Sequence, residues 1–312
     1  MAPVNRRIGG LEVSVAGLGC NNLGGRIDEA RSREVVGAAL EAGITVFDTA
    51  DLYADGRSEE FLGRALGGHR DDVVIISKFG MRRPPGRLSG GDPAWVPQAC
   101  AQSLQRLGTD HIDLYLLHHP DPTVPVADTL GAMSRLVDQG LVREIGCSNF
   151  EGADLEEAAS ASHGPEQRPL AALENEYSLL NRDPEPEVLP TCERWDLAFI
   201  PYYPLASGLL SGKYRRGRSV PAGTRLGGRG GDPTERVVAE DRLAAVERLA
   251  AFAEERGHTL LELSMSWLAA RRGVATVVAG ATSAAQVRAN ATATTAWDLT
   301  EDELTEVDRL TG

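Results

Sequence analysis

The sequence has little of what marks secreted, membrane-bound or zinc-binding proteins. Its four cysteines are scattered, and no two of them form a C-x-x-C pair or the spacing of a zinc site. No stretch reaches the roughly 18 unbroken apolar residues that a membrane helix needs. The charged N-terminal residues are not followed by the apolar run of a signal peptide. These absences predict a cytoplasmic protein in a reducing compartment, with no membrane partner.

Positive charge is also scarce. Lys and Arg together number 32 against 45 Asp and Glu, which gives a formal net charge of −13. A surface this acidic repels phosphate backbones, so we expect no nucleic-acid partner. The one clearly basic stretch, KYRRGR at residues 213–218, is either a solvated loop or a contact for a cofactor phosphate.

What the chain does have is a regular alternation of two hydrophobic patterns. Apolar, strand-like runs recur at roughly 25- to 35-residue intervals. They occupy residues 13–19, 44–50, 73–80, 112–118, 142–149, 170–177, 197–203 and 274–280. Segments with helical periodicity lie between them, among others at residues 31–42, 96–107, 126–139 and 240–256. Strands that alternate with helices imply a parallel sheet, and eight such units predict a closed (β/α)8 TIM barrel, a single domain over residues 1–312.

Two further segments modify the predicted barrel. RRIGGLEVSV indicates an N-terminal β-hairpin across Gly9 and Gly10, placed to plug one end of the barrel. The Gly-rich loop after strand 7, at residues 207–233, is too long for an ordinary connection and is either a functional flap or disordered. A doubly wound dinucleotide-binding sheet is the main competing fold. It fails because Asn22 stands where G-x-G-x-x-G needs its third glycine.

Four polar residues stand out against the apolar runs. Asp48, Lys78 and His118 each lie at the end of a different run, and Tyr53 follows in the loop after the first of them. Taken alone, each is more often structural than catalytic. In a barrel, however, the carboxyl ends of the strands converge on one face, and a buried ammonium such as Lys78 needs a carboxylate such as Asp48. Such a group suits proton transfer to a carbonyl oxygen.

Five segments together resemble the aldo-keto reductases. They are GITVFDTADLYADGRSEEFLGRAL, VVIISKFG, DLYLLHHP, VREIGCSNF and VVAGATSAAQVRAN, and the similarity runs from about residue 13 to 290. The resemblance implies an NAD(P)H-dependent carbonyl reductase, with a small carbonyl compound or sugar as substrate. It makes Tyr53 the proton donor and His118 the group that orients the carbonyl. Lys78, paired with Asp48, is expected to lower the pKa of the phenol.

The resemblance also implies a cofactor site along the strand ends. In the family, the residues equivalent to Ser148 and Asn149 hold the nicotinamide carboxamide, and the ring stacks on the equivalent of Tyr202. The pyrophosphate and adenosine ends are expected at the loop after strand 7 and at the helix that begins near Ser283. The full predicted set is Gly19, Cys20, Asn21, Asp48, Ser148, Asn149, Glu174, Tyr202, Leu205, Ser207, Gly208, Leu210, Lys213, Gly280, Ala281, Thr282, Ser283, Gln286 and Asn290.

The chain departs from the family pattern at two places. Glu174 replaces a glutamine that helps hold the carboxamide, and a carboxylate cannot donate to the amide oxygen unless it is protonated. We therefore expect a raised pKa or weakened cofactor binding, unless the strand register leaves Glu174 peripheral. Gly280 and Gln286 stand where many NADPH-selective members are basic. NADPH remains the expected cofactor, with NADH as the alternative and Lys213 or Arg225 as substitute contacts.

Other functions share this fold. The resemblance leaves a sugar or sugar-nucleotide dehydrogenase or enoyl reductase, or a non-catalytic NADPH-binding regulatory subunit, as alternatives. Potassium-channel β subunits typically have Asn where this chain has His118, and enoyl-reducing members have Glu there, so His118 favours carbonyl reduction. No metal is expected, because His119 should point away from His118 on an extended strand. The sequence leaves open whether the protein is a monomer or a homo-oligomer.

Overall fold

The computed structural model of the chain describes residues 5–81, 90–214 and 240–311. Arg225 and residues 215–233 of the expected flap lie outside these ranges.

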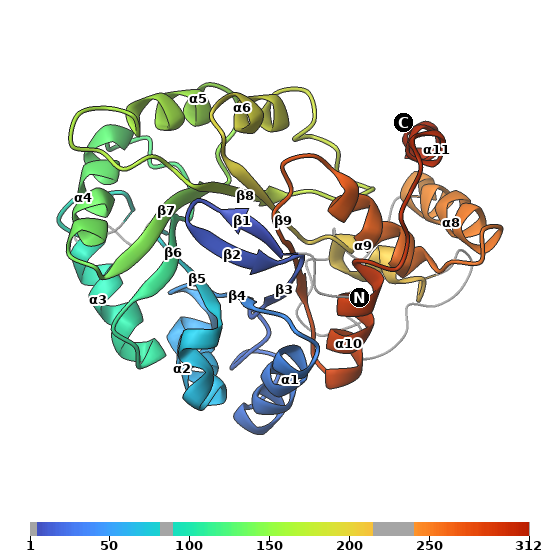
Figure 1. Ribbon diagram of the computed structural model, residues 1–312, viewed down its shortest axis with the longest axis horizontal. Helices are drawn as coiled ribbons and strands as arrows, with labels where there is room; N and C mark the ends of the chain where they lie inside the picture. The colour runs from blue at the N-terminus through green and yellow to red at the C-terminus, as the bar shows by residue number, and fades with distance from the viewer. Residues whose placement is uncertain (1–4, 82–89, 215–239, 312) are drawn as a thin grey trace.

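Eight parallel strands close into a barrel in the order β10-β3-β4-β5-β6-β7-β8-β9 (Figure 1). The strands are β3 (Ala16–Gly19), β4 (Val46–Asp48), β5 (Val74–Phe79), β6 (Ile112–Leu117), β7 (Val142–Ser148), β8 (Ala172–Glu176), β9 (Ala198–Tyr202) and β10 (Val277–Gly280). Each lies inside one of the eight apolar runs, so the predicted (β/α)8 barrel is confirmed. The runs are apolar at consecutive positions because both faces of each strand are covered, one by the barrel interior and the other by helices.

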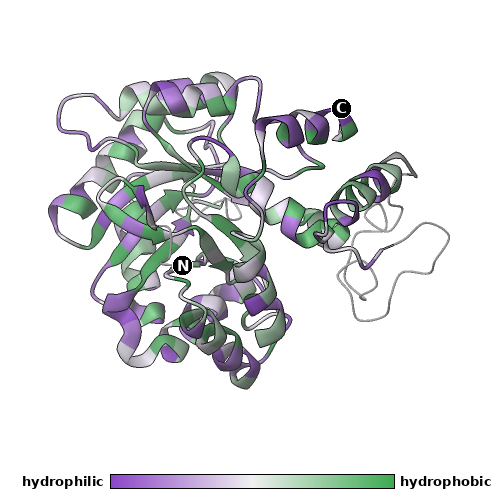
Figure 2. Ribbon diagram, turned by 45° about the vertical axis from the view of Figure 1, so that its right-hand side comes forward, coloured by the Kyte–Doolittle hydropathy of each residue, from purple (hydrophilic) through white to green (hydrophobic). Residues whose placement is uncertain are grey.

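Helices surround the barrel, most of them as a ring and some near the C-terminus to one side of it, with polar residues mainly outward and apolar residues toward the strands (Figures 1 and 2). They are α1 (Glu29–Glu41), α2 (Arg57–Leu66), α3 (Val96–Leu107), α4 (Val126–Asp138), α5 (Gly152–Ala161), α6 (Val188–Arg194), α8 (Glu240–Glu254), α9 (Leu260–Ala270), α10 (Ala284–Ala293) and α11 (Glu301–Thr311), with short 3-10 turns η1 (Tyr53–Gly56), η2 (Gly67–Asp72) and η3 (Ala206–Ser211). Side-chain caps set several helix starts. Asp28 accepts from the backbone N–H of Arg31, and Thr259 and Glu262 form a reciprocal capping box.

The predicted N-terminal hairpin is present. Strands β1 (Asn5–Ile8) and β2 (Leu11–Ser14) pair antiparallel around Gly9, which has φ +52°. Buried hairpin residues such as Leu11 belong to the same apolar cluster as the inward-facing Val46 and Ile76 of the barrel. The hairpin lies across the barrel in Figure 1. It therefore covers the end at which the strands begin, and the opposite end is left for a site.

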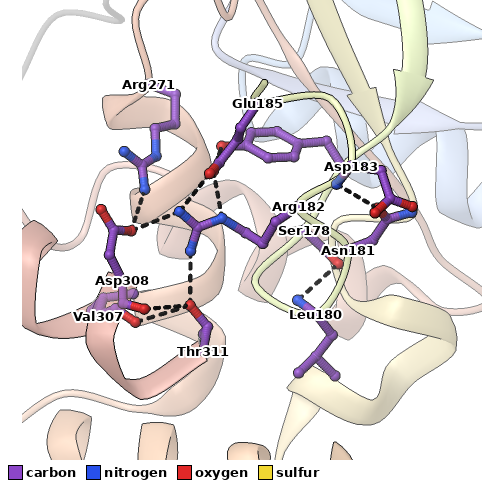
Figure 3. A network of polar contacts seen from close by, with 11 residues as sticks. Ser178, Leu180, Asn181, Arg182, Asp183, Glu185, Arg271, Val307, Asp308 and Thr311 are labelled. Carbon is purple, nitrogen blue, oxygen red and sulfur yellow. Dashed lines mark hydrogen bonds and ion pairs between the residues drawn. The ribbon is translucent and has the colours of Figure 1, made fainter. Parts of the chain in front are cut away.

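A polar network attaches the C-terminal helix α11 to the segment after β8 (Figure 3). Asp308 of α11 accepts from Arg182 at 2.8 Å and from Arg271 at 2.7 Å. Arg182 also pairs with Glu185 and donates to the hydroxyl of Thr311 at 2.8 Å. Charge-assisted bonds of this kind fix geometry as well as adding stability. The network thus joins segments that lie more than a hundred residues apart in the sequence.

The four cysteines are all buried and free. Burial raises the pKa of Cys20, Cys100, Cys147 and Cys192, so each remains a neutral thiol that acts as a small apolar filler. Within the described ranges, no helix combines the length and apolar character needed to cross a membrane.

Candidate active site

The four residues singled out in the sequence lie together at the carboxyl ends of adjacent strands. Asp48 is the last residue of β4, Lys78 the next-to-last of β5, and His118 directly follows β6. Tyr53 begins the turn η1 after β4. Register explains the convergence, because Asp48 pairs with Ile76 and Lys78 with Leu116. Lys78 therefore lies two residues beyond the partner of Asp48, and His118 two residues beyond the partner of Lys78, a stagger that accompanies the tilt of strands in a closed barrel.

Lys78 is the centre of the group and is fully buried. Its Nζ donates to a carboxylate oxygen of Asp48 and, at 3.1 Å, to the backbone carbonyl of Thr49. Glu174 Oε1 lies 3.3 Å from the same nitrogen. Burial would lower the pKa of Lys78, but the carboxylates of Asp48 and Glu174 outweigh it and raise that pKa well above its usual value. Lys78 is therefore a permanent cation.

Glu174 is 1% exposed and faces this cation, so the alternative register that would leave it peripheral is wrong. Strand pairing with Ser148 and Ile200 fixes its position. Burial, followed by the negative charge of Asp48, raises the pKa of Glu174 to about 8, although Lys78 acts in the opposite direction. The predicted rise is thus present. One ammonium cannot neutralise two buried carboxylates, and Asp48 makes the closer contact with it, so the proton resides on Glu174 at neutral pH.

Tyr53 lies between the cation and the mouth of the barrel. Lys78 Nζ is 5.3 Å from the centroid of its ring, and the ring meets His118 edge-on at 6.0 Å between centroids. Lys78 does act to lower the pKa of Tyr53, but burial and the carboxylates of Asp48 and Glu174 raise it by more. The expected net lowering is therefore wrong. The phenol keeps its proton at neutral pH, which is the form a proton donor needs.

His118 is a neutral imidazole. Burial, then the charge of Lys78 and the neighbouring His119, lower the pKa of His118 well below its usual value. Its Nδ1 is buried and has no hydrogen-bond partner among the described residues. The expectation that His119 points away is wrong, because the two rings stack at 5.2 Å with 10° between their planes. Past the end of β6 the chain no longer follows strand alternation. No cluster of three metal-binding side chains exists within the described part of the chain.

Beside this group, the expected nicotinamide contacts form a hydrogen-bonded set. Tyr202 donates its hydroxyl proton to Asn149 Oδ1 at 2.7 Å, and Asn149 Nδ2 donates to the backbone carbonyl of His118 at 2.9 Å. Ser148 donates to the backbone carbonyl of Glu174 at 2.7 Å. Asn149 has φ +60°, a left-handed conformation that turns its side chain back over the strand ends. The amide orientation is thereby fixed before any ligand binds.

One cavity of about 610 Å³ is lined by Asp48, Tyr53, His118, Ser148, Asn149, Glu174 and Tyr202, whereas Lys78 lies beneath its wall. It passes from Tyr53 and His118 over Asn149 and Tyr202 to the start of α10. The predicted cofactor residues that line it are Gly19, Asn21, Asp48, Ser148, Asn149, Glu174, Tyr202, Leu205, Ser207, Gly208, Lys213, Gly280, Ala281, Thr282, Gln286 and Asn290. Cys20, Leu210 and Ser283 are not among the lining residues. Cys20 and Leu210 are buried in the core, and Ser283 caps α10 by accepting from the N–H of Gln286.

Sequence reasoning missed several lining residues. The most informative is Arg26, an exposed cation in the loop after β3. The rule applied to Asp48, Lys78 and His118, that polar residues beyond strand ends meet at the mouth, would also have found it. The other unpredicted lining residues are Asn22, Tyr203, Pro204, Ser211, Leu261, Val278, Ala279 and Ala289.

The lining fits a dinucleotide with a nicotinamide ring. The Tyr202 ring suits the nicotinamide end, and the start of α10 suits a phosphate end. Two buried atoms at the strand ends, His118 Nδ1 and Glu174 Oε2, are without a hydrogen-bond partner in the described chain, as expected of groups that serve a ligand. The sequence contains two lysines, and both belong to this region: Lys78 under the mouth and Lys213 on the cavity wall.

Comparison with known proteins agrees with the geometry. The model of the aldo/keto reductase family matches residues 16–311. The chain is 32% and 30% identical, over 287 residues, to proteins of Oryza sativa subsp. japonica and Arabidopsis thaliana, each described as a probable voltage-gated potassium channel subunit beta. In both cases 90% of this chain and 87% of the relative are covered.

Two solved structures have the same fold over nearly the whole chain. An aldo-keto reductase from Bacillus halodurans in its holo form superposes with a TM-score of 0.82 at 32% identity, covering 99% of this chain and 96% of that one. The glycerol dehydrogenase of Gluconobacter oxydans gives 0.84 at 27% identity, covering 99% and 95%. The chain therefore belongs to the aldo/keto reductase family, whose members are oxidoreductases that use a nicotinamide cofactor.

Proposed function

We propose that the chain reduces an aldehyde or ketone to an alcohol with NADPH, and that Tyr53 is the proton donor. The observation that carries this proposal is the joint placement of a neutral phenol, a neutral imidazole and a buried ammonium at one end of the cavity. When bound there, the nicotinamide supplies the hydride. The protein's task is to position the carbonyl and to deliver a proton to its oxygen.

The residues divide that task between them. The hydroxyl of Tyr53 donates its proton to the carbonyl oxygen, while the imidazole of His118 donates a hydrogen bond to the same oxygen. Because both rings are neutral, neither attracts a charged carboxylate substrate more strongly than an uncharged aldehyde or ketone. Lys78 stabilises the phenolate that Tyr53 becomes, since its ammonium lies 5.3 Å from the ring centroid. Asp48 holds Lys78 in place.

NADPH rather than NADH is supported by two cations on the cavity wall, Arg26 and Lys213. The start of α10, beside Thr282 on the cavity wall, adds a helix N-terminus of the kind that favours phosphate. Titration of each reduced cofactor by fluorescence tests this choice. We expect NADPH to bind at least about tenfold more tightly than NADH, a difference of about 1.4 kcal/mol. Equal affinity would remove the preference.

A second candidate is a non-catalytic subunit that binds the cofactor, because the two plant relatives are described as probable channel β subunits. The imidazole of His118 at the mouth favours catalysis. Screening a panel of aldehydes, ketones, quinones and aldoses for NADPH oxidation separates the two candidates. Tight NADPH binding without turnover of any member would favour the subunit.

Replacing Tyr53 tests the assigned proton donor. Tyr53→Phe keeps the ring but removes the proton, so kcat/KM should fall by at least about 100-fold, the usual worth of a general acid. The dissociation constant of NADPH should stay within about twofold, since the hydroxyl is assigned to the carbonyl and not to the cofactor. Near-normal turnover would show that another group supplies the proton.

A further inference from the structure

The barrel mouth contains one more acidic group than its chemistry requires. Asp48 already pairs with Lys78, yet Glu174 brings a second carboxyl group to 3.3 Å from the same ammonium. Both acidic side chains are buried. A buried carboxyl beyond charge balance is costly when ionised, so its presence beside the cofactor cavity calls for a role.

We propose that Glu174 couples a proton to the redox state of the bound nicotinamide: its carboxylate favours the oxidised cofactor, and its neutral carboxyl favours the reduced one. This inference rests on the proposed function of the site, because it requires a nicotinamide beside β8. It adds a determinant of cofactor state to the residues that act on the carbonyl.

The geometry of the side chain gives the two forms different properties. Oε1 faces Lys78, whereas Oε2 is buried without a hydrogen-bond partner in the described residues, and Glu174 lines the cavity. A neutral carboxyl offers one O–H donor and one carbonyl acceptor, the same pair that a glutamine amide offers a carboxamide. An ionised carboxyl only accepts, and it carries a negative charge. An oxidised nicotinamide ring is a cation and a reduced one is neutral, so ionisation of Glu174 discriminates between them.

Glu174 is the group that changes its charge near neutral pH, because the charged and titratable groups around it keep theirs. Asp48 from β4 and Lys78 from β5 form a close ion pair; burial raises the pKa of Asp48 as well, but the contact with Lys78 opposes that rise. Tyr53 from η1 and Tyr202 from β9 also face it, and burial raises the pKa of each phenol, so both stay neutral. The neighbouring strand β7 contributes Ser148, which does not titrate.

Two further groups lie nearby. His118, after β6, stays neutral because burial lowers its pKa. Glu176 follows two residues along β8 and is partly exposed, on the side of Tyr202. With burial and Asp48 raising the pKa of Glu174 to about 8, its proton is the one exchanged near neutral pH.

The proton balance is simple. Oxidised cofactor binds to the neutral carboxyl form, the O–H bond of Glu174 breaks, and one proton leaves to solvent while the carboxylate remains. No electron pair moves other than that of the O–H bond. Because one proton is released, the affinity for NADP+ rises by up to about tenfold per pH unit until Glu174 is already ionised in the free protein. The affinity for NADPH does not rise in this way.

Paired titrations test the inference. The dissociation constants of NADP+ and NADPH are measured by fluorescence between about pH 6 and pH 9, for the wild type, Glu174→Gln and the matched control Glu176→Gln. Both cofactors carry the same phosphates, so their titration cancels in the ratio of the two constants. In the wild type the ratio for NADP+ over NADPH should fall at least about tenfold across this range. In Glu174→Gln it should stay within about twofold, and in Glu176→Gln it should follow the wild type.

A second readout needs no variant. Adding NADP+ to the wild type in weakly buffered solution near pH 7 should release a substantial fraction of one proton per site, seen with a pH indicator dye. A pH-independent ratio, or no proton release, overturns the role of Glu174. If the wild type nevertheless reduces carbonyls and Tyr53→Phe does not, the proposed function stands while this inference fails. If neither nucleotide binds, both fail.

Discussion

Glu174→Gln should change how the stability of the ligand-free protein depends on pH. The pKa of this carboxyl rises from 4.5 to about 8 on folding, chiefly through burial. Between pH 4.5 and about pH 8 the folded protein therefore keeps the proton of Glu174, whereas the unfolded chain has released it. The contribution of Glu174 to the free energy of unfolding is therefore most favourable below about pH 4.5 and is lost as pH rises to about 8. Above about pH 8 Glu174 is ionised in both the folded and the unfolded state, so no further stability is lost through it.

The size of the effect follows from the shift. Each pH unit between the two pKa values costs at most about 1.4 kcal/mol, and the full difference sets an upper bound of about 5 kcal/mol. Relaxation around Lys78 and Asp48 makes the loss smaller than this bound, so we expect Glu174 to lower the free energy of unfolding by about 2 kcal/mol. Glutamine fills the same space and has no proton to lose. The gain in stability of Glu174→Gln over the wild type should therefore grow from about pH 5 to pH 8 and then level off.

Urea unfolding followed by circular dichroism at several pH values measures this difference. Titrating groups away from the site contribute equally to both proteins, so the difference isolates Glu174 together with the Asp48–Lys78 pair that it faces. Glu157→Gln on α5, an exposed position, serves as the control and should give a flat difference. Parallel stability curves for Glu174→Gln and the wild type between about pH 5 and pH 9 would refute the assigned protonation.

Two further substitutions test the surroundings. Lys78→Met removes the cation that stabilises the phenolate of Tyr53, so kcat should fall at least about 100-fold; a smaller loss in steady-state assays would contradict that role. Asp308→Asn weakens the pairs with Arg182 and Arg271. Because the Asp308 side chain is 42% exposed, the loss should be about 1 kcal/mol, or a melting temperature lower by about 2 °C. The control Asp298→Asn, at an exposed position, should have the melting temperature of the wild type. If the melting temperature of Asp308→Asn is also unchanged, the pairs with Arg182 and Arg271 do not stabilise the attachment of α11.

The fold was predictable because its signal is local. Each barrel strand is buried on both faces, so its run of apolar residues stands out without any knowledge of its neighbours. The carboxyl ends of parallel strands meet at one face, and this rule alone predicts that Asp48, Lys78 and His118 lie together. The helix limits were off by no more than two residues, because capping depends on single side chains such as Asp28.

The electrostatics of the site were less predictable because they depend on tertiary distances. The sequence identified the cation near Tyr53 but not how much burial and two carboxylates would oppose it, so the direction of the phenol's pKa shift was wrong. No pattern in the sequence linked Glu174 to Lys78, since contact between β5 and β8 is across the barrel interior and not between neighbouring strands. His119 was misplaced because strand alternation was extended past the last paired residue.

The distribution of lysine makes the protein unusually easy to label at its cavity. Of the 32 basic residues, only Lys78 and Lys213 carry a primary amine on the side chain. Lys78 is fully buried, whereas Lys213 is exposed on the cavity wall. Arginine is not acylated by ordinary amine reagents, because its guanidinium stays protonated. Apart from the α-amino group, such a reagent should therefore attach a fluorophore at Lys213 alone, giving an optical report of cofactor binding in a protein without engineered residues.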